Sequence, residues 1–146
     1  MRPPFSWATT PVYQMFADYV QFKDEDVRTI AETTDFLCVE KKHGLHDLGS
    51  ADAGAKHAIA QFKALKPDMT CLVYLNSAFA YPFIQRAKVF DNKGAIHEPE
   101  NARYKAFLLT DPETGELAYR EGDHVHYFDV LNPEFRAWWV DAVAEF

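Results

Sequence analysis

The sequence predicts an α/β fold built on a parallel sheet. Three short apolar runs alternate with two segments of helical periodicity over residues 11–75. Near-continuous apolar runs are typical of strands that are covered on both faces. A strand that returns parallel to its neighbour needs a crossover connection, which is usually a helix. The alternation of strands and helices therefore favours a parallel sheet with crossover helices.

Capping and terminating residues mark the two helices between these strands. Asp24 is a good N-cap for the first helix, and Ser50 is one for the second. Short polar side chains accept hydrogen bonds from the otherwise unpaired amides of a first helical turn. Pro67 ends the second helix, and residues 41–49 before it form a polar loop. We expect the three strands at residues 11–16, 35–40 and 71–75.

The regular alternation ends after the third strand. Residues 78–105 contain aromatic and basic side chains, with a short helix expected at 82–90. Residues 110–115 form a turn-rich segment that is typical of a β-hairpin. Long excursions from a regular scaffold usually carry function or specificity. We therefore interpret residues 78–126 as a functional excursion that contains a hairpin.

The final stretch, residues 127–146, predicts a short apolar strand that enters a helix. Asn132 is placed to cap that helix. Trp138 and Trp139 recur with Phe135 at helical spacing, which assigns them to the core and not to a sugar-binding surface. The apolar face continues without a terminating Gly, Asn or Pro, so we expect a longer parent protein.

The composition suits a globular protein and argues against two classes of partner. The chain is 48% hydrophobic and 25% charged, with a net charge of −7. Nucleic-acid backbones attract clustered Lys and Arg, so this charge argues against a nucleic-acid partner. No apolar run approaches the roughly 20 residues of a membrane-spanning helix. The first residues lack the apolar region of a signal peptide, although a longer parent protein is compatible with secretion or a periplasmic location.

Cysteines and histidines give no clear sign of a disulfide or a metal site. Cys38 and Cys71 lie in predicted strands, where buried thiols are expected. A single bridge between neighbouring strands is the alternative. The loop histidines lack the fixed spacing of a zinc motif, so we expect polar loop residues, no metal ion and no other cofactor. These histidines are His43, His46, His124 and His126.

Four short motifs stand in an informative order. They are Phe5-Ser6-Trp7 with Pro11-Val12-Tyr13, Asp35-Phe36-Leu37-Cys38-Val39-Glu40-Lys41, Leu72-Val73-Tyr74-Leu75-Asn76-Ser77 with Tyr81-Pro82, and Phe128-Asp129-Val130-Leu131-Asn132-Pro133-Glu134-Phe135-Arg136. In this order they resemble hypothetical glycosyl-hydrolase families that have a (β/α)8, or TIM-barrel, catalytic domain.

The resemblance implies a fold and an activity. Residues 1–146 are expected to form the N-terminal part of a (β/α)8 TIM barrel, with a β-hairpin excursion after the third strand. A complete barrel needs about 250 residues, so this chain holds only the first strand–helix units. An open sheet of this kind leaves unpaired edges and bare inner side chains. The implied activity is hydrolysis of glycosidic bonds in a polysaccharide or oligosaccharide.

Barrel active sites lie at the carboxyl ends of the strands, which selects candidate binding residues. Glu40 either accepts a hydrogen bond from a sugar hydroxyl, held by Lys41 or Lys42, or is a rim charge or structural ion pair. Asn76 either binds a hydroxyl or caps its loop. Aromatic rings, Phe79 among them, offer a flat surface for a sugar ring. The predicted substrate-binding residues are Trp7, Glu40, Lys41, Asn76 and Tyr81.

The catalytic residues are expected outside the chain. Glycoside hydrolysis needs two carboxylates, and in the resembling families these usually follow the fourth strand and later ones. We therefore expect residues 1–146 alone to be inactive. Asp129 is expected to be structural, and Arg136 to pair with an acidic side chain. Two alternatives stay open: a non-catalytic carbohydrate-binding barrel, and a complete small α/β domain that binds a partner through its hairpin region.

Overall fold

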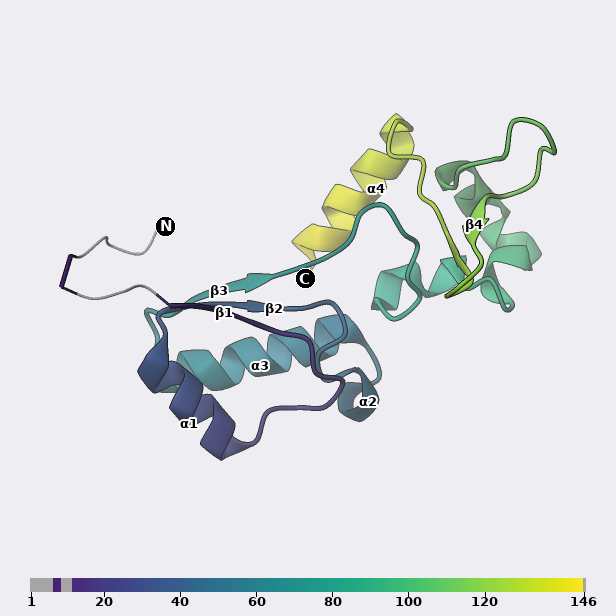
Figure 1. The fold of residues 1–146 in the computed structure, drawn as a ribbon. Coiled ribbons are helices and arrows are strands. Elements are labelled where there is room, and N and C mark those ends of the chain that lie inside the picture. Colours follow the sequence, from purple (N-terminus) through teal and green to yellow (C-terminus); the bar gives the residue numbers. More distant parts are fainter. Residues whose placement is uncertain (1–6, 9–11, 146) are drawn as a thin grey trace. The chain divides into compact units, whose positions relative to one another are not determined.

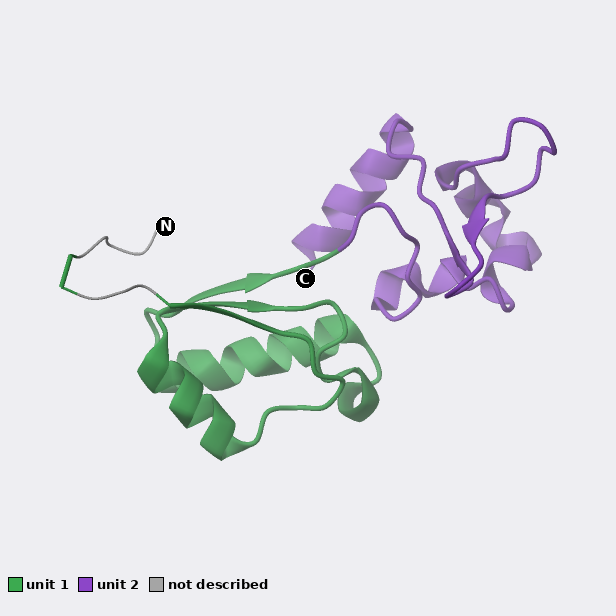
Figure 2. Ribbon diagram, in the orientation of Figure 1, with its two compact units in different colours: residues 1–75 green, residues 76–146 purple. Residues whose placement is uncertain are grey.

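The computed structural model describes residues 7–8 and 12–145 and divides into two compact units. Unit 1 comprises residues 1–75 and unit 2 comprises residues 76–146 (Figure 2). Unit 1 is a three-stranded sheet with its helices, whereas unit 2 combines short helices with a two-stranded sheet (Figure 1). Each unit is described by itself below.

The sheet of unit 1 is parallel throughout, as the sequence predicts. The strands stand in the order β1-β2-β3, and both neighbouring pairs are parallel. Helices α1 and α3 cross between consecutive strands and lie on one face of the sheet (Figure 1). The sheet stays open, and the described residues form no closed barrel. The elements of unit 1 are β1 (Tyr13–Phe16), α1 (Asp24–Thr33), β2 (Phe36–Val39), α2 (Leu45–Leu48), α3 (Ala51–Leu65) and β3 (Thr70–Val73).

The two faces of this sheet differ in their exposure. Successive side chains of a strand point to opposite faces. Leu37 and Val39 of the central strand are fully buried. In the register of the sheet, Met15 of β1 and Leu72 of β3 flank Cys38, on the opposite face. Met15 and Leu72 are both about half exposed. The outer strands are therefore covered on one face. The central strand, whose apolar run predicts cover on both faces, has Cys38 buried on the second face as well.

The register also explains why the two cysteines stay apart. Cys71 is the partner of Leu37, and Cys38 is the partner of Leu72. The two sulfur atoms therefore point to opposite faces of the sheet. Both thiols are free, Cys38 being buried and Cys71 half-buried. The alternative of a bridge between them is excluded in this structure.

Two of the predicted boundaries in unit 1 need correction. Asp24 is the first residue of α1 and not its cap; the cap position belongs to Lys23, whose amide donates to the Asp26 carboxylate at 3.3 Å. The loop 41–49 is not irregular throughout, because it contains the short helix α2. Ser50 caps α3 as predicted, and its hydroxyl accepts from the amide of Ala53 at 3.3 Å.

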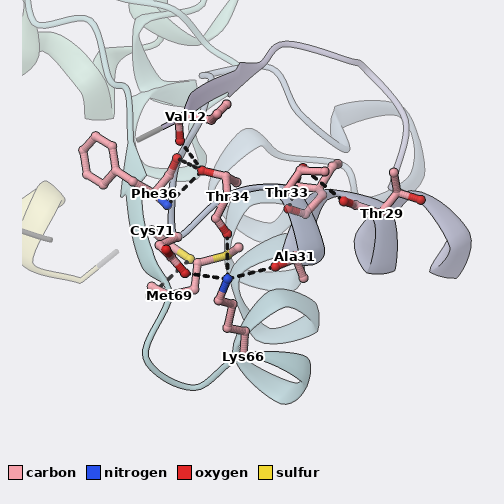
Figure 3. Close-up of polar contacts among 11 residues, drawn as sticks. Val12, Thr29, Ala31, Thr33, Thr34, Phe36, Lys66, Met69 and Cys71 are labelled. Carbon is pink, nitrogen blue, oxygen red and sulfur yellow. Dashed lines mark hydrogen bonds and ion pairs between the residues drawn. The ribbon is translucent and has the colours of Figure 1, made fainter. Parts of the chain in front are cut away.

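Buried polar contacts fasten the amino-terminal edge of the sheet (Figure 3). The hydroxyl of Thr34 accepts from the Phe36 amide at 3.1 Å and also contacts the carbonyl oxygen of Val12. Lys66 donates to the carbonyl oxygens of Ala31 and Thr34, at 3.0 and 3.1 Å. These two carbonyls lie at the end of α1, where helical partners are missing. Thr34 and Lys66 therefore join β1, α1, β2 and α3 at one end.

Replacing Thr34 by Val tests this junction. The side chain is buried, so the Thr34→Val variant leaves the Phe36 amide without its partner in a dry environment. We expect a loss of about 1–3 kcal/mol in the free energy of unfolding, measured by urea denaturation. Thr33→Val is the matched control, because Thr33 is exposed and its hydroxyl bonds carbonyls of its own helix; it should change stability by less than about 0.5 kcal/mol. Equal losses in both variants would contradict the role of Thr34.

Unit 2 contains little regular hydrogen-bonded structure. Its helices before residue 110 are 3-10 helices, which are usually short because of their poorer hydrogen-bond geometry. The helix expected at 82–90 is present in part, as the first of them. The elements are η1 (Gln85–Phe90), η2 (Ala95–His97), η3 (Pro99–Phe107), β4 (Tyr119–Arg120), β5 (Val125–His126) and α4 (Pro133–Ala144).

The predicted hairpin is confirmed in altered form. Strands β4 and β5 form an antiparallel pair around the turn at 121–124. The turn-rich segment 110–115 is closed by an isolated bridge between Thr110 and Leu117 and by a hydrogen bond from the Asp111 amide to the Glu116 carbonyl at 2.8 Å. The prediction of a regular apolar strand at 127–131 is wrong. Tyr127 and Phe128 make isolated antiparallel bridges instead.

Helix α4 is held by a cluster of aromatic rings. The Phe135 ring stacks on Phe128 with centroids 4.4 Å apart, and Trp138 meets Phe90 edge-on at 5.2 Å. Phe135 is buried, whereas Trp138 and Trp139 are half-buried. Both rings pack on aromatic rings of unit 2, which supports the prediction that they belong to a core. The apolar side chains in the later part of α4 are more exposed than Phe135.

Local contacts at the start of α4 match two predictions and correct one. Asn132 caps the helix, accepting from the Glu134 amide at 2.8 Å. Asp129 is structural, since its carboxylate accepts from the Leu131 amide at 3.0 Å. Arg136 does not pair with an acid; it donates to the carbonyl oxygens of Val130 and Leu131, at 3.2 and 2.6 Å. None of the described helices has both the length and the apolar character required to cross a bilayer.

Candidate functional site

The carboxyl ends of the three parallel strands form one edge of unit 1. The hydrogen-bond ladder extends one residue past the strands at this edge. The Glu40 amide donates to the carbonyl of Phe16 at 2.7 Å, and the Tyr74 amide donates to that of Val39 at 2.9 Å. Glu40 and Tyr74 are therefore fixed by backbone pairing, side by side in the sheet order.

Glu40 is sheltered and paired. Its carboxylate forms an ion pair with the ammonium of Lys41, and the two side chains are only 11% and 20% exposed. The Lys41 nitrogen also lies 4.9 Å from the centroid of the Tyr74 ring, a cation–π distance. Lys41, and not Lys42, is the lysine that holds Glu40. A paired carboxylate still has unused lone pairs, so this geometry allows a hydrogen bond from a ligand hydroxyl.

Lys42 belongs to a second group at the same edge. Its ammonium donates to the Tyr19 hydroxyl at 3.0 Å, and the His46 ring stacks on Tyr19 at 4.9 Å. The Asp47 carboxylate accepts from the amide of Gln21 at 2.8 Å. These contacts join the loop after β2 to the loop after β1, which gives the edge a defined polar surface.

His43 is a buried core residue, which the sequence did not indicate. We expected a polar loop histidine, but the side chain is 1% exposed and its ring stacks on Phe22 at 4.2 Å. Neither ring nitrogen has a hydrogen-bond partner among the described residues. Burial lowers the pKa of His43, assisted by His57 and opposed by Asp18 and Asp47. Its imidazole is therefore kept neutral near pH 7.

The backbone of His43 fits against helix α3 because Gly54 has no side chain. A Cβ atom on Gly54 would lie 1.8 Å from the His43 carbonyl oxygen, far inside any permitted contact. Gly44 sits equally close to this helix and adopts a φ of +67°, which glycine tolerates best. The loop that carries Glu40 to Asp47 is therefore positioned by a backbone-to-helix contact.

Substituting Gly54 by Ala should displace this loop. We expect a loss of about 1–3 kcal/mol or more in the free energy of unfolding, because the added methyl group overpacks a rigid contact. Amide resonances of residues 40–47 should shift in the same variant. Gly122→Ala is the matched control, since a Cβ there meets nothing within 4 Å. Unchanged resonances in the Gly54→Ala variant would refute the close contact.

Stability should decrease on acidification because of His43. Its pKa in the folded state lies below the unfolded value of about 6.5, so the unfolded chain binds the proton more readily. The contribution of the neutral ring to the free energy of unfolding is complete above about pH 6.5 and is lost as the pH falls below that value. Urea denaturation at about pH 7.5 and about pH 5.5 measures this loss, and His43→Phe should reduce it. Burial also lowers the pKa of His126, so the His43→Phe variant should keep the part of the pH dependence that comes from His126. A pH dependence identical in the wild type and His43→Phe would contradict this assignment.

The remaining predicted site residues are Asn76, Tyr81 and Trp7. Asn76 and Tyr81 belong to unit 2. The Asn76 carboxamide oxygen accepts from the amides of Ala78 and Phe79, at 2.8 and 3.2 Å, which confirms its loop-capping role. Trp7 is 95% exposed, and its neighbours 1–6 and 9–11 lie outside the described residues. That all five residues meet at one rim stays a prediction.

Tyr81 is part of a group of half-buried aromatic rings and exposed charged side chains. Its ring stacks on Phe83 with centroids 4.7 Å apart, and its hydroxyl lies 3.4 Å from the Asp123 carboxylate. Arg120 donates two hydrogen bonds to Asp123, at 2.8 and 2.6 Å, and lies over the Phe79 ring. Hydrogen bonding to Asp123 raises the pKa of Arg120. Flat rings beside hydrogen-bonding groups are suited to bind sugars.

The described part of the chain contains no cluster of His, Cys, Asp or Glu suited to a metal ion.

The structure thus defines a mixed α/β protein with a parallel three-stranded sheet and a small antiparallel hairpin. The family model described as "Hypothetical glycosyl hydrolase family 15" matches residues 63–146, more than half of the chain. The chain belongs to this hypothetical glycosyl hydrolase family. The matched range includes Asn76, Tyr81 and all of unit 2, but not Trp7, Glu40 or Lys41. No curated protein matches the chain.

Proposed function

We propose that this chain is part of a glycoside hydrolase that cleaves glycosidic bonds in a polysaccharide or oligosaccharide. The observation that supports this most directly is the family match over residues 63–146. Family membership supports this class of reaction, whereas a fold alone does not identify a function. The residues proposed to bind the substrate therefore rest on the geometry of the chain, whereas the catalytic residues are expected outside it.

We further propose that residues 1–146 form the first three strand–helix units of a TIM barrel, with the excursion inserted after β3. Barrel strands follow one another in sequence order, with the helices on the outside. The order β1-β2-β3 and the one-sided covering by α1 and α3 agree with that arrangement. The exposed apolar side chains of Tyr13, Met15 and Leu72 then correspond to the inner face of a barrel.

In this proposal the predicted rim residues bind the sugar. Glu40 accepts from a hydroxyl group while Lys41 holds its carboxylate, and Asn76 contributes a side-chain amide. Trp7 and Tyr81 provide flat rings for the apolar face of a sugar. The two carboxylates that cleave the bond come from strands that follow these three in the complete barrel. The chain itself contributes binding and orientation.

The Glu40→Gln variant tests the binding role of the rim. We expect the full-length gene product to release reducing sugars from at least one polysaccharide in a panel of starch, cellulose, xylan, mannan and chitin. Glu40→Gln should raise KM about tenfold with little change in kcat, because one charge-assisted hydrogen bond to the sugar is weakened. Glu98→Gln is the matched control, since Glu98 is exposed and does not follow a strand of the sheet.

Three outcomes would overturn parts of this proposal. No release from any polysaccharide, with retained binding, would identify a carbohydrate-binding barrel. A collapse of kcat in Glu40→Gln with KM unchanged would make Glu40 a catalytic residue and not a binding residue. The absence of both binding and release would remove carbohydrate as the ligand.

A further inference from the structure

Unit 2 contains an open pocket that none of the predicted site residues touches. Its volume is about 590 Å³, within the range of small-molecule sites. It is lined only by residues of the excursion, between 92 and 126. Most of its lining side chains are polar, among them Asn92, His97, Lys105, Glu116, Tyr119 and His126.

Backbone pairing builds two walls of this pocket. Tyr119 and His126 are directly opposite each other on β4 and β5, and cross-strand partners point to the same face. Their rings are 6.3 Å apart and nearly perpendicular. The bridge between Thr110 and Leu117 fixes the adjoining wall. The positions of Tyr119, His126 and Thr110 are therefore set by backbone pairing.

His126 presents an unused acceptor. The side chain is 2% exposed, and its Nδ1 lies 3.2 Å from the carbonyl oxygen of Ala118. A carbonyl oxygen only accepts, so Nδ1 carries the ring proton and Nε2 carries a lone pair. Nε2 is buried and has no hydrogen-bond partner among the described residues. Burial lowers the pKa of His126, which keeps this lone pair available at neutral pH. A buried acceptor without a donor is costly and calls for an explanation.

The lining favours a neutral ligand rich in hydroxyl groups. Lys105 and Glu116 carry opposite charges, which offset each other in the lining of the pocket. An anion would face Glu116, and a cation would face Lys105. Hydroxyl groups, which both donate and accept, suit the mixed amide, phenol and imidazole groups of the wall.

We propose that this pocket is a second carbohydrate subsite, in which a hydroxyl of a neutral sugar donates to Nε2 of His126 and Tyr119 lies against the sugar ring. The choice of a sugar rests on the proposed function, whereas the pocket and its unused acceptor do not. The excursion after β3 then adds a binding position of its own to the protein.

Titration of the chain with D-glucose, D-galactose, D-mannose and D-xylose tests the subsite. Nuclear magnetic resonance of the His126 and Tyr119 rings should show saturable shifts with at least one sugar. His126→Phe keeps a flat ring and removes the acceptor, so the Tyr119 signals should report binding weakened about three- to tenfold. His57→Phe makes the same chemical change at an exposed position of unit 1 and should leave the affinity unchanged. Thr110→Trp, at an exposed wall position, should block the pocket even if His126→Phe folds poorly.

Several results would overturn the subsite. These are the absence of shifts with all four sugars, equal affinity in the wild type and Thr110→Trp, or equal affinity in the wild type and His126→Phe. Inorganic phosphate that shifts these rings in place of the sugars would show that Lys105 selects an anion. If the titration fails while Glu40→Gln still raises KM, the subsite is wrong and the proposed function stands. If sugars bind here but no polysaccharide is cleaved, the subsite stands and the hydrolase is wrong.

Discussion

The parallel hydrogen-bond ladder between β1, β2 and β3 is the constraint on which unit 1 depends. Because both strand pairs are parallel, all three strands end at the same edge. The backbone hydrogen bonds continue one residue beyond the strands, to Glu40 and Tyr74. The same register decides which side chains meet the helices and which are exposed. Neither the cation–π contact of Lys41 nor the separation of the two thiols would exist if β2 were shifted by one residue, since every side chain would change faces.

Unit 2 obeys a different constraint, because it lacks an extended ladder. Its strands are two residues long, and several of its backbone pairings are isolated bridges. Side-chain packing replaces the missing backbone order. Phe90, Phe128, Phe135 and Trp138 contact one another edge-on or stacked, and aromatic pairs contribute beyond the area that they bury. Aromatic packing thus contributes in unit 2 the order that backbone pairing provides in unit 1.

Features set by near neighbours in the chain were predictable, and those set by distant ones were not. Ser50 and Asn132 cap their helices because the partners lie two or three residues away. The parallel sheet followed from the alternation of apolar runs and helical periodicity. His43 was missed because its burial depends on Phe22 and on Gly54, whose missing side chain admits the loop. The polar pocket of the excursion was missed for the same reason, since Asn92, Lys105 and His126 are far apart in sequence. Glu40 and Lys41 gave a usable signal, namely a charged pair directly after an apolar strand.

The distribution of tryptophan and cysteine makes the two units separately observable. The chain has three tryptophans; Trp7 is exposed, and the other two lie in the aromatic cluster of unit 2. A change in indole emission during denaturation therefore reports chiefly on unit 2. Both cysteines belong to the sheet of unit 1, and burial raises the pKa of the Cys71 thiol, which slows its reaction with alkylating reagents. Fluorescence and thiol labelling, recorded on one sample, would thus follow the unfolding of unit 2 and of unit 1, respectively, without any engineered probe.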